Sequence, residues 1–477
     1  MCASSFDRHS ARARKGFVLP TAAFLFILAI PMVGLAIDLG LTYMIQSKVQ
    51  AAADAASLAA VRSLSRGNND DAQKTSAKNT AKAYLAANFP SGFMGTATPV
   101  VADPDVQNLD HSRTVKVDIS VDIPRLFLRW FGTNSINVKG TSTATRRDVN
   151  VVVVMDRSGS LANSMSCTPL KAAAADFVNK FAEARDNVGL VTFASSSRVD
   201  FALASNFKTA SLSVASIMNS VNCSGATNTA QGLWQGYQAL ATLNQPAALN
   251  VIVFFTDGQP TAITAQMQSK GGCNPANVKT GVFTVGFNSS GNPVATGGVF
   301  DYQAPAQPMS SDMTIIPAAN GGSAGCSFAP SWPNNWTSGS NDVNVPTTDL
   351  WGNNLTNGYQ PVTVSGSYVS VPSNSTGASN MINASTNAAD DAAARIRAEA
   401  SPGAGLNAVP GVIVFSIGLG NSNFPANHEF LKRVANTTDS SSHTSAAPDG
   451  LYIYCPTSDD LSDAFNRIAS EILRLAK

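Results

Sequence analysis

The chain has 477 residues, a net charge of +1 and 13% charged residues, which is about half the share of roughly 25% found in soluble domains. The near-neutral charge argues against a polyanion partner and therefore against nucleic-acid binding. The length allows two or three domains, and 44% apolar residues are enough to bury a core.

The amino-terminal segment predicts a membrane anchor. Residues 1–16 form a basic tail, and residues 17–36 are twenty predominantly apolar residues without a charge, long enough to span a bilayer as a helix. A cleaved signal peptide is the alternative, but no A-x-A site follows the apolar run at once. We therefore predict a transmembrane helix over 17–45. Basic residues before the span place the amino terminus in the cytoplasm and everything after about residue 46 outside it, with the anchor in the inner membrane.

Residues 37–63 keep helical spacing and are rich in alanine. An apolar span ending in G-L-A-I-D-L-G and followed by Q-S-K-V-Q-A-A-A-D-A-A-S-L-A-A resembles the amino-terminal segment of TadG-like proteins, which belong to the Tad (Flp) pilus-assembly systems of bacteria. The resemblance covers about residues 14–65. Prepilin-like relatives carry Glu five residues after the Gly of their cleavage site, whereas this chain has Thr21 at that distance from Gly16. We therefore do not expect prepilin processing.

The region 46–147 predicts a pilin-like stalk. After a polar break at 64–70, a further helix is expected over about 71–88. Residues 115–124, VKVDISVDIP, alternate as a half-exposed strand does, and so does the stretch from Ile136 to Arg146. A short apolar segment, Phe127–Gly132, lies between these two strands.

A buried strand followed by polar residues begins the next domain, predicted over 148–477. The run Val151–Met155 is typical of a strand buried on both faces, and Asp156-Arg157-Ser158-Gly159-Ser160 follows it directly. Parallel strands bind ligands at their carboxyl edge. The oxygens of Asp156, Ser158 and Ser160 are the donors that Mg²⁺ or Mn²⁺ prefers.

Two later loops add oxygen donors. Thr227 precedes a predicted helix over Thr229–Leu243, and Asp257 follows a second buried strand, Val251–Phe255, in the sequence T-D-G. The pattern D-x-S-x-S, then Thr, then T-D-G resembles the metal-ion-dependent adhesion site (MIDAS) of von Willebrand factor A domains. The resemblance implies a doubly wound, mainly parallel α/β sheet of Rossmann-like type. It implies a metal site formed by Asp156, Ser158, Ser160, Thr227 and Asp257, in which the hydroxyls contact the ion and the carboxylates act largely through water.

Two alternatives to a working metal site remain open. The domain can have this fold with a silent site, or Ser158 can be a nucleophile. The second alternative is disfavoured because Ser158 has no G-x-S-x-G setting and no His near it in sequence. We therefore expect a protein that is not an enzyme.

The remaining elements alternate between strands and helices, as in a parallel sheet covered on both faces. We expect helices at about Pro169–Ala184, Ala388–Ala400 and after Ser458, and strands at Asn187–Phe193, Arg198–Leu203 and Gly411–Gly418.

An insertion over 259–386 separates Asp257 from the next helix. It is rich in Gly, Asn, Ser, Thr and Pro, and it holds three of the five tryptophans, at positions 332, 336 and 351. Strand-like runs at Val282–Phe287 and Gln360–Val371 predict a β-rich subdomain rather than one long loop. It is either a spacer or part of the binding surface.

Five of the six cysteines, all except Cys2, lie outside the cytoplasm under this topology. Cys167 and Cys223 flank loops that must converge on one ion, so we predict a disulfide between them. Cys273–Cys326 is a second expected pair, which leaves Cys455 free. No C-x-x-C spacing indicates zinc.

The sequence thus favours a membrane-anchored, metal-dependent adhesion component of a Tad pilus-assembly system that binds an acidic protein partner, with a carboxylate from the partner completing the octahedral shell of the ion. A structural scaffold subunit with a silent metal site is the alternative. Metal-dependent partner binding, and its loss in Asp156→Ala, distinguishes the two.

Overall fold

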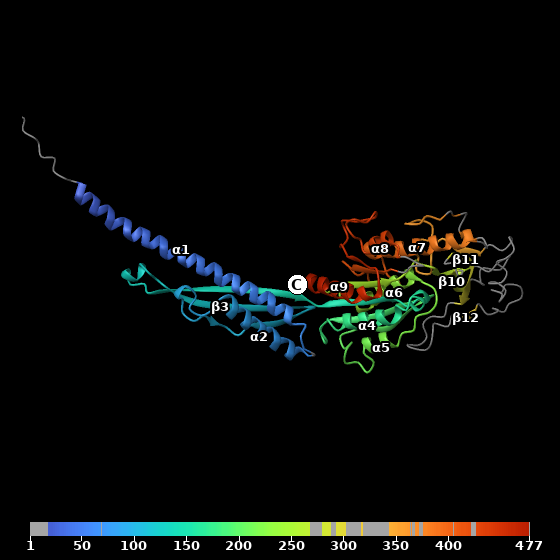
Figure 1. Ribbon diagram of the computed structural model, residues 1–477, viewed down its shortest axis with the longest axis horizontal. Coiled ribbons are helices and arrows are strands. Elements are labelled where there is room, and N and C mark those ends of the chain that lie inside the picture. Colours follow the sequence, from blue (N-terminus) through green and yellow to red (C-terminus); the bar gives the residue numbers. More distant parts are fainter. Residues whose placement is uncertain are drawn as a thin grey trace, which may run out of the picture. The chain divides into compact units, whose positions relative to one another are not determined.

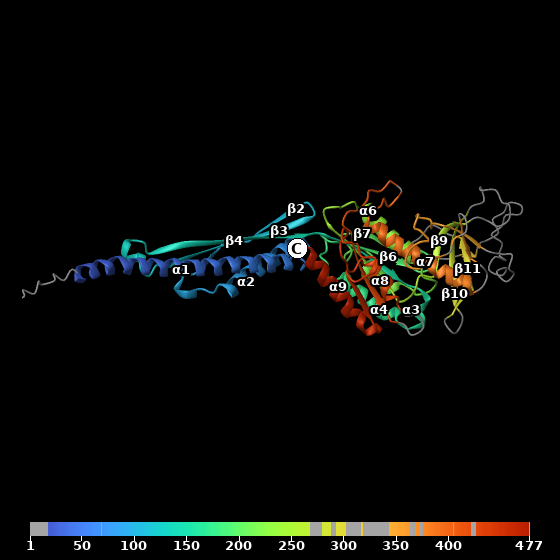
Figure 2. The same ribbon diagram turned by 90° about the horizontal axis from the view of Figure 1, so that it is seen from above.

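The computed structural model (Figures 1 and 2) describes residues 18–67, 69–267, 279–287, 292–301, 316–317, 343–362, 364, 368–371, 375–403, 405–420 and 426–476. The chain forms two compact units. The first comprises Met1–Val61, Ala77–Val106 and Val115–Ala144, and the second comprises Arg62–Ser76, Gln107–Thr114 and Thr145–Lys477. Two short segments that precede the predicted domain boundary at residue 148 therefore belong to the second unit.

The first unit is built on helix α1 (Val18–Ser63), which has 46 residues. The predicted membrane span and the alanine-rich stretch after it form this one helix. Between Phe24 and Met44 most of its large apolar side chains are exposed, whereas from Ile45 onward one face is buried. Within the described residues, Thr21–Ser63 is the one helical stretch long and apolar enough to cross a membrane.

A small sheet and a second helix complete this part of the chain. Helix α2 spans Asp70–Asn88, and the strands are β1 (Val100–Val101), β2 (Asp105–Leu109), β3 (Ser112–Pro124) and β4 (Ser135–Arg147). The order is β1-β3-β2, and β4 also pairs with β3. Every second residue of β3 from Val115 to Ile123 is buried, which confirms the half-exposed strand expected from the alternation. Short 3-10 turns, η1 (Phe93–Gly95) and η2 (Leu128–Phe131), lie in the connecting loops.

The second unit contains a six-stranded sheet of order β16-β15-β8-β5-β6-β7. Its neighbours pair in parallel, except that β6 and β7 are antiparallel. This confirms the predicted mainly parallel α/β architecture. The strands are β5 (Val149–Asp156), β6 (Asn187–Phe193), β7 (Ser197–Ala204), β8 (Leu249–Thr256), β15 (Ile413–Leu419) and β16 (Tyr452–Cys455).

Helices cover both faces of this sheet. Val151 and Val153 of β5 pack into a core formed with α4, α5 and α9, whereas Val152 and Val154 pack into a second core with α6, α7 and α8. Both faces of β5 are therefore apolar, which is why its sequence is an unbroken apolar run. The helices are α3 (Gly159–Asn163), α4 (Cys167–Val178), α5 (Val214–Ser220), α6 (Thr229–Leu243), α7 (Ser375–Arg397), α8 (His428–Val434) and α9 (Leu461–Leu475), with η5 (Ser458–Asp460) before α9.

Two predicted helices differ from the observed ones. Helix α4 covers Cys167–Val178 rather than 169–184, and the residues after it form turns. Helix α7 begins at Ser375, inside the predicted insertion over 259–386. Its first half is rich in Ser, Thr and Asn and resembles a loop in composition, but Ala378 and Met381 recur at helical spacing and are buried in the core.

The insertion is β-rich, as predicted. An antiparallel sheet of order β12-β11-β10-β9 and a hairpin of β13 with β14 follow Asp257. Of the strand predicted at Gln360–Val371, the described part forms a strand only at Tyr368–Val371. Trp332, Trp336, Cys273 and Cys326 lie outside the described residues, as does the predicted Cys273–Cys326 bridge. The strands are β9 (Ala262–Met267), β10 (Lys279–Phe287), β11 (Pro293–Asp301), β12 (Ile316–Pro317), β13 (Val343–Pro346) and β14 (Tyr368–Val371).

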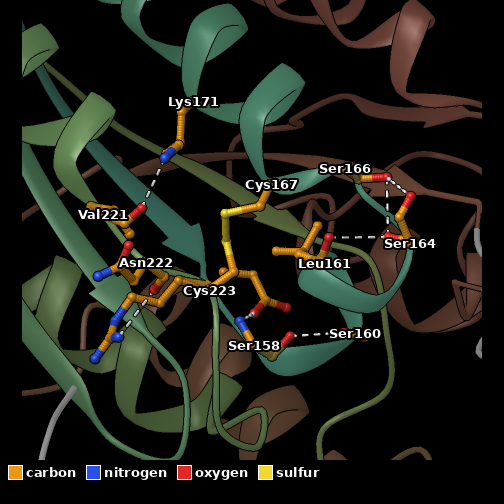
Figure 3. The surroundings of a disulfide bond; sticks show 12 residues. Ser158, Ser160, Leu161, Ser164, Ser166, Cys167, Lys171, Val221, Asn222 and Cys223 are labelled. Atoms are coloured by element: carbon orange, nitrogen blue, oxygen red, sulfur yellow. Dashed lines mark hydrogen bonds between the residues drawn. A yellow bond between two sulfur atoms is a disulfide. The ribbon is translucent and has the colours of Figure 1, made fainter. Parts of the chain in front are cut away.

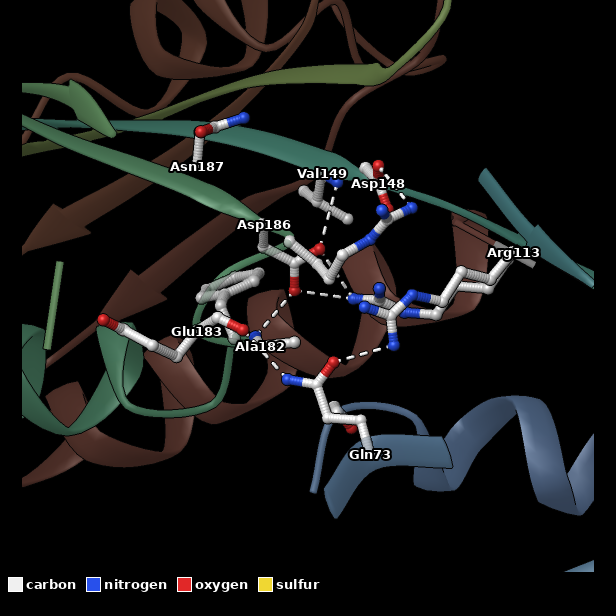
Figure 4. Close-up of polar contacts among 12 residues, drawn as sticks. Gln73, Arg113, Asp148, Val149, Ala182, Glu183, Asp186 and Asn187 are labelled. Atoms are coloured by element: carbon white, nitrogen blue, oxygen red, sulfur yellow. Dashed lines mark hydrogen bonds and ion pairs between the residues drawn. The ribbon is translucent and has the colours of Figure 1, made fainter. Parts of the chain in front are cut away.

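A buried ion pair supports the start of β5 (Figure 4). Arg146 Nη2 donates to both oxygens of Asp186, at 2.8 and 2.6 Å, and both side chains are buried. Asp186 also accepts hydrogen bonds from the backbone N–H groups of Val149 (3.1 Å) and Ala182 (2.7 Å). The carboxylate thus joins β5 to the turn before β6.

Arg113 extends this cluster to the earlier segments of the second unit. Its guanidinium donates to Gln73 Oε1 at 2.8 Å and pairs with Asp70 at 2.9 Å. Gln73 in turn donates to the carbonyl oxygen of Glu183 at 2.9 Å. Burial, together with the nearby charge of Arg185, lowers the pKa of Arg113 to about 10. These contacts hold residues 62–76 and 107–114 within the second unit.

Candidate metal centre

The predicted site lies where β5 and β8 end side by side. The two strands pair in parallel up to Met155 and Phe255, so Asp156 and Thr256 come next to each other. Asp156 accepts a hydrogen bond from the Ser158 N–H through Oδ1 (2.7 Å) and from the Thr256 hydroxyl through Oδ2 (2.6 Å). Both bonds fix the carboxylate at the carboxyl edge of the sheet.

Hydroxyl groups connect this edge to the second carboxylate. The Oγ atoms of Ser158 and Ser160 are 2.9 Å apart (Figure 3), and the Ser160 hydroxyl donates to Asp257 Oδ1 at 2.7 Å. Ser158 and both carboxylates are buried, whereas Ser160 is partly exposed. The structure therefore brings four predicted residues, Asp156, Ser158, Ser160 and Asp257, into one hydrogen-bonded group that opens to solvent at Ser160.

Thr227, the fifth predicted residue, lies in a loop that is hydrogen-bonded to the loop of Ser158 and Ser160. The loop before it contacts the first loop through Gly159 N–H to Gly225 O (2.9 Å). The N–H of Thr227 donates to Thr261 Oγ1 at 3.0 Å. Gly225 has a positive φ of 92°, and a Cβ there would lie 2.8 Å from Ser195 Oγ, so glycine suits both the backbone conformation and the close approach of this loop to Ser195.

A disulfide also joins the segments that flank these two loops. Cys167, at the start of α4, is bonded to Cys223, with their Cα atoms 6.2 Å apart (Figure 3). The pairing expected from the sequence is thus present. Lys171 adds a second connection, because its Nζ donates to the carbonyl oxygen of Val221 at 3.0 Å. Cys455 is free and buried, and burial raises the pKa of its thiol to about 12.

The electrostatics of the group suit a cation. Burial raises the pKa of Asp156 above its ordinary value, and the nearby carboxylate of Asp257 raises it further. Two buried carboxylates that disfavour each other's ionisation are stabilised when a divalent ion lies between them. Carboxylate and hydroxyl oxygens are hard donors, so the residues fit Mg²⁺ or Mn²⁺. The described residues contain no cluster of three or more His, Cys, Asp or Glu, so a site here depends on hydroxyls.

The prediction missed three supporting residues. Thr256 fixes Asp156, Thr261 fixes the loop of Thr227, and Ser195 accepts a hydrogen bond from the Ala226 N–H at 2.9 Å. Thr256 stands in the T-D-G motif, so its position next to Asp257 could have indicated a role in the site. Thr261 and Ser195 come from the insertion and from the turn between β6 and β7, and no local pattern distinguishes them.

Two family models match the chain. Residues 151–259 match the von Willebrand factor type A domain, and residues 16–63 match the family described as putative Flp pilus-assembly TadE/G-like. The chain therefore combines a TadE/G-like amino-terminal segment with a von Willebrand factor A domain. Together with the apolar half of α1, the TadE/G-like match identifies a single-pass membrane anchor. No curated protein matches the chain.

Solved structures with a similar arrangement include several pilus proteins. The D319A mutant of the PilB minor pilin from Streptococcus sanguinis has a TM-score of 0.38 at 15% identity, covering 79% of this chain and 78% of that one. The von Willebrand factor domain of the type V pili tip protein Mfa5 from Porphyromonas gingivalis has a TM-score of 0.37 at 15% identity, covering 70% and 98%. With TM-scores below 0.5, these likenesses carry no weight in assigning function.

Proposed function

We propose that this protein is a membrane-anchored binding component of a bacterial Tad (Flp) pilus-assembly system and that it is not an enzyme. The TadE/G-like match at residues 16–63 supports the system, and the exposed apolar half of α1 supports the anchor. Basic residues precede the span, which supports an inner-membrane anchor with a cytoplasmic amino terminus and with the bulk of the chain periplasmic or extracellular.

The binding step is proposed to occur through Mg²⁺ or Mn²⁺ held by Asp156, Ser158, Ser160, Thr227 and Asp257. The observation that carries this proposal is the pair of buried carboxylates joined through the backbone N–H and hydroxyl of Ser158 and the hydroxyl of Ser160 at the end of the sheet. The bound ion supplies a positive charge that attracts a carboxylate. Because Ser160 is the accessible member of the group, an acidic partner approaches from its side and completes the octahedral shell.

A scaffold with a silent site is the second candidate function. The hydrogen bond from Ser160 to Asp257 and the one from Thr256 to Asp156 supply partners for these carboxylates without an ion. In this case the A domain contributes packing surfaces to a pilus or envelope assembly, and metal removal has no effect on its binding.

Calorimetry tests the metal site directly. The detergent-solubilised full chain is titrated with Mg²⁺, and we expect binding in the low millimolar range or tighter for the wild type and none for Asp257→Ala. Asp176→Ala, at an exposed carboxylate of α4, is the matched control and should bind like the wild type. If wild type and Asp257→Ala give the same heats, the metal proposal is wrong.

Partner capture separates the two candidate functions. The immobilised chain is mixed with an envelope extract in Mg²⁺ or in EDTA. Proteins that are retained only in Mg²⁺, and that are lost with Asp257→Ala but kept with Asp176→Ala, support metal-dependent adhesion. Proteins that are retained equally in EDTA, by a chain that binds Mg²⁺ in calorimetry, favour the scaffold.

A further inference from the structure

An exposed apolar loop ends the β3–β4 hairpin of the first unit. We call residues 126–131 the apolar loop, and η2 lies within it. The side chains of Leu126, Phe127 and Trp130 are 50%, 38% and 80% exposed. Exposure of three large apolar side chains on one short loop to water is unfavourable. Neither the A domain nor its metal site explains them.

The apolar loop is attached to α1 through one carboxylate. Asp38 Oδ1 accepts a hydrogen bond from the Leu126 N–H at 3.0 Å, and Oδ2 accepts from Phe127 (3.1 Å) and Leu128 (2.8 Å). These N–H groups lie at the start of η2, where a helical turn has no internal acceptors. Asp38 is buried, and the positive charge of Arg125 acts on it.

A second contact lies one helical turn earlier on α1. A Cβ at Gly34 would be 2.7 Å from the Cβ of Phe127, so only glycine allows the loop to approach this closely. Residues 34 and 38 lie on the same face of a helix. The tip of the hairpin therefore stays at one level along α1, and Figure 2 shows it beside this helix.

That level lies about one hydrocarbon-core thickness along the apolar half of α1. From Val18 to Asp38 the helix rises roughly 30 Å at 1.5 Å per residue, which is the thickness of a bilayer's hydrocarbon core. Apolar side chains such as Phe26 and Met32 are exposed along this length. Past Asp38, Leu39, Tyr43 and Met44 are still exposed over roughly 9 Å of helix, and the exposed positions then become polar from Gln46 to Lys48.

We propose that the apolar loop is a second membrane contact, inserted into the interfacial layer of the leaflet in which the span of α1 ends. Trp130, Leu126 and Phe127 lie at the boundary between headgroups and acyl chains, where tryptophan is favoured. Arg129, which is exposed, reaches the lipid phosphates. Near the hydrocarbon a bare carboxylate is costly, and the backbone of the loop offsets this cost for Asp38.

The consequence is a fixed orientation of the first unit on the membrane. A single helix can rotate about its axis in a bilayer, whereas a helix with a second contact beside it cannot. This inference does not depend on the metal site, since it uses only contacts within the first unit. It does require that α1 inserts, and flotation with lipid vesicles measures insertion separately.

Fluorescence quenching tests the position of Trp130. The full chain is reconstituted into vesicles of phosphatidylcholine and phosphatidylglycerol, and floated material is compared with Trp130→Phe so that the difference reports Trp130. We expect strong quenching by lipids brominated near the headgroup and several-fold weaker quenching by aqueous iodide than for a control tryptophan. The control is Trp130→Phe with Tyr84→Trp, at an exposed position of α2. Position 84 lies away from the apolar loop. Lys82, close to Tyr84, pairs with Asp103, and the neighbouring Ala102 N–H donates to the Asp118 carbonyl oxygen. Asp118 is six residues, or about 20 Å, along β3 from Pro124, where the strand ends before the loop.

The variant Asp38→Ala tests the attachment of the loop. This variant should still float with vesicles, but Trp130 should become accessible to iodide because the N–H groups of the loop have lost their acceptor, the Asp38 carboxylate. If Trp130 of the floated wild type is quenched by iodide and not by brominated lipid, the loop faces water and the proposal is overturned. Shielding from both quenchers, which indicates a protein neighbour, and failure of the wild type to float each overturn it as well.

Discussion

Removing the Cys167–Cys223 disulfide should destabilise the A domain mainly because the unfolded chain gains conformational entropy, and less because contacts of the folded state are lost. The bridge closes a loop with a sequence separation of 56 residues. In the chain-entropy relation, a loop of this length corresponds to about 4 kcal/mol at 25 °C. We therefore expect the double variant Cys167→Ser with Cys223→Ser to lose about 4 kcal/mol of unfolding free energy.

Most native contacts of the two loops remain in this variant. The hydrogen bonds from Gly159 to Gly225 and from Lys171 to Val221 do not involve the sulfur atoms. The folded state should thus keep its geometry, while the unfolded chain gains freedom. The metal affinity of the folded variant should accordingly change little.

The free thiol of Cys455 provides an assay specific to this domain. It is buried in the core beside α9, and its pKa of about 12 keeps it protonated in the folded state. Unfolding returns it to the ordinary reactivity of a thiol with a pKa near 8.5. Alkylation of the Cys455 peptide, read by mass spectrometry across a urea series, reports the transition. With an m-value of about 3 kcal/mol/M, the midpoint should fall by more than about 1 M urea.

The reduced wild type is the internal control and should match the double variant. A conservative change elsewhere on α4, Lys171→Met, removes the other connection between the loops and should shift the midpoint much less. If the oxidised wild type and the double variant unfold at the same urea concentration, the loop-closure reasoning is refuted.

Three further predictions follow from the charged groups. Arg146→Ala leaves the buried carboxylate of Asp186 without its ionic partner and should cost about 3–5 kcal/mol in urea unfolding. Arg474→Ala breaks an exposed pair with Glu471 and should change stability far less, and equal losses would contradict the burial argument. Burial raises the pKa of Asp349 to about 6, so the folded state favours its protonated form. The stability that this protonation contributes is complete below about pH 4 and is lost as pH rises through about 6. Asp349→Asn should lack this decline in a pH series of thermal unfolding. Saturating Mg²⁺ should stabilise the wild type by about 2.7 kcal/mol at one hundred times its dissociation constant, and a melting temperature that does not respond to Mg²⁺ argues against the site.

Local sequence patterns were enough to predict the main elements and to indicate that Asp156, Ser158, Ser160 and Asp257 lie close together. The apolar run of β5 indicated a strand buried on both faces, because both helix layers pack on it. The order of Asp156, Ser158 and Asp257 after two such strands indicated that they share one edge, since parallel strands end together. The pairing of Cys167 with Cys223 followed from the same convergence.

Features that depend on distant residues were not predictable in this way. Helix α7 starts inside a stretch with loop-like composition, and it is helical because its alanines pack on the core. Thr261 and Ser195 support the site from other elements, and nothing in their local sequence indicates that role.

The anchor shows most clearly which features local sequence predicts and which depend on distant residues. Twenty apolar residues before Asp38 predict a membrane span by length alone, because a helix must cross a bilayer of fixed thickness. A carboxylate at the end of that span and a short apolar segment about ninety residues later are unrelated in sequence. Only the β3–β4 hairpin brings the apolar loop back to α1, so its backbone N–H groups reach Asp38. The sequence by itself therefore determined where the chain can enter the membrane, and the tertiary structure decided which surface of the first unit lies against it.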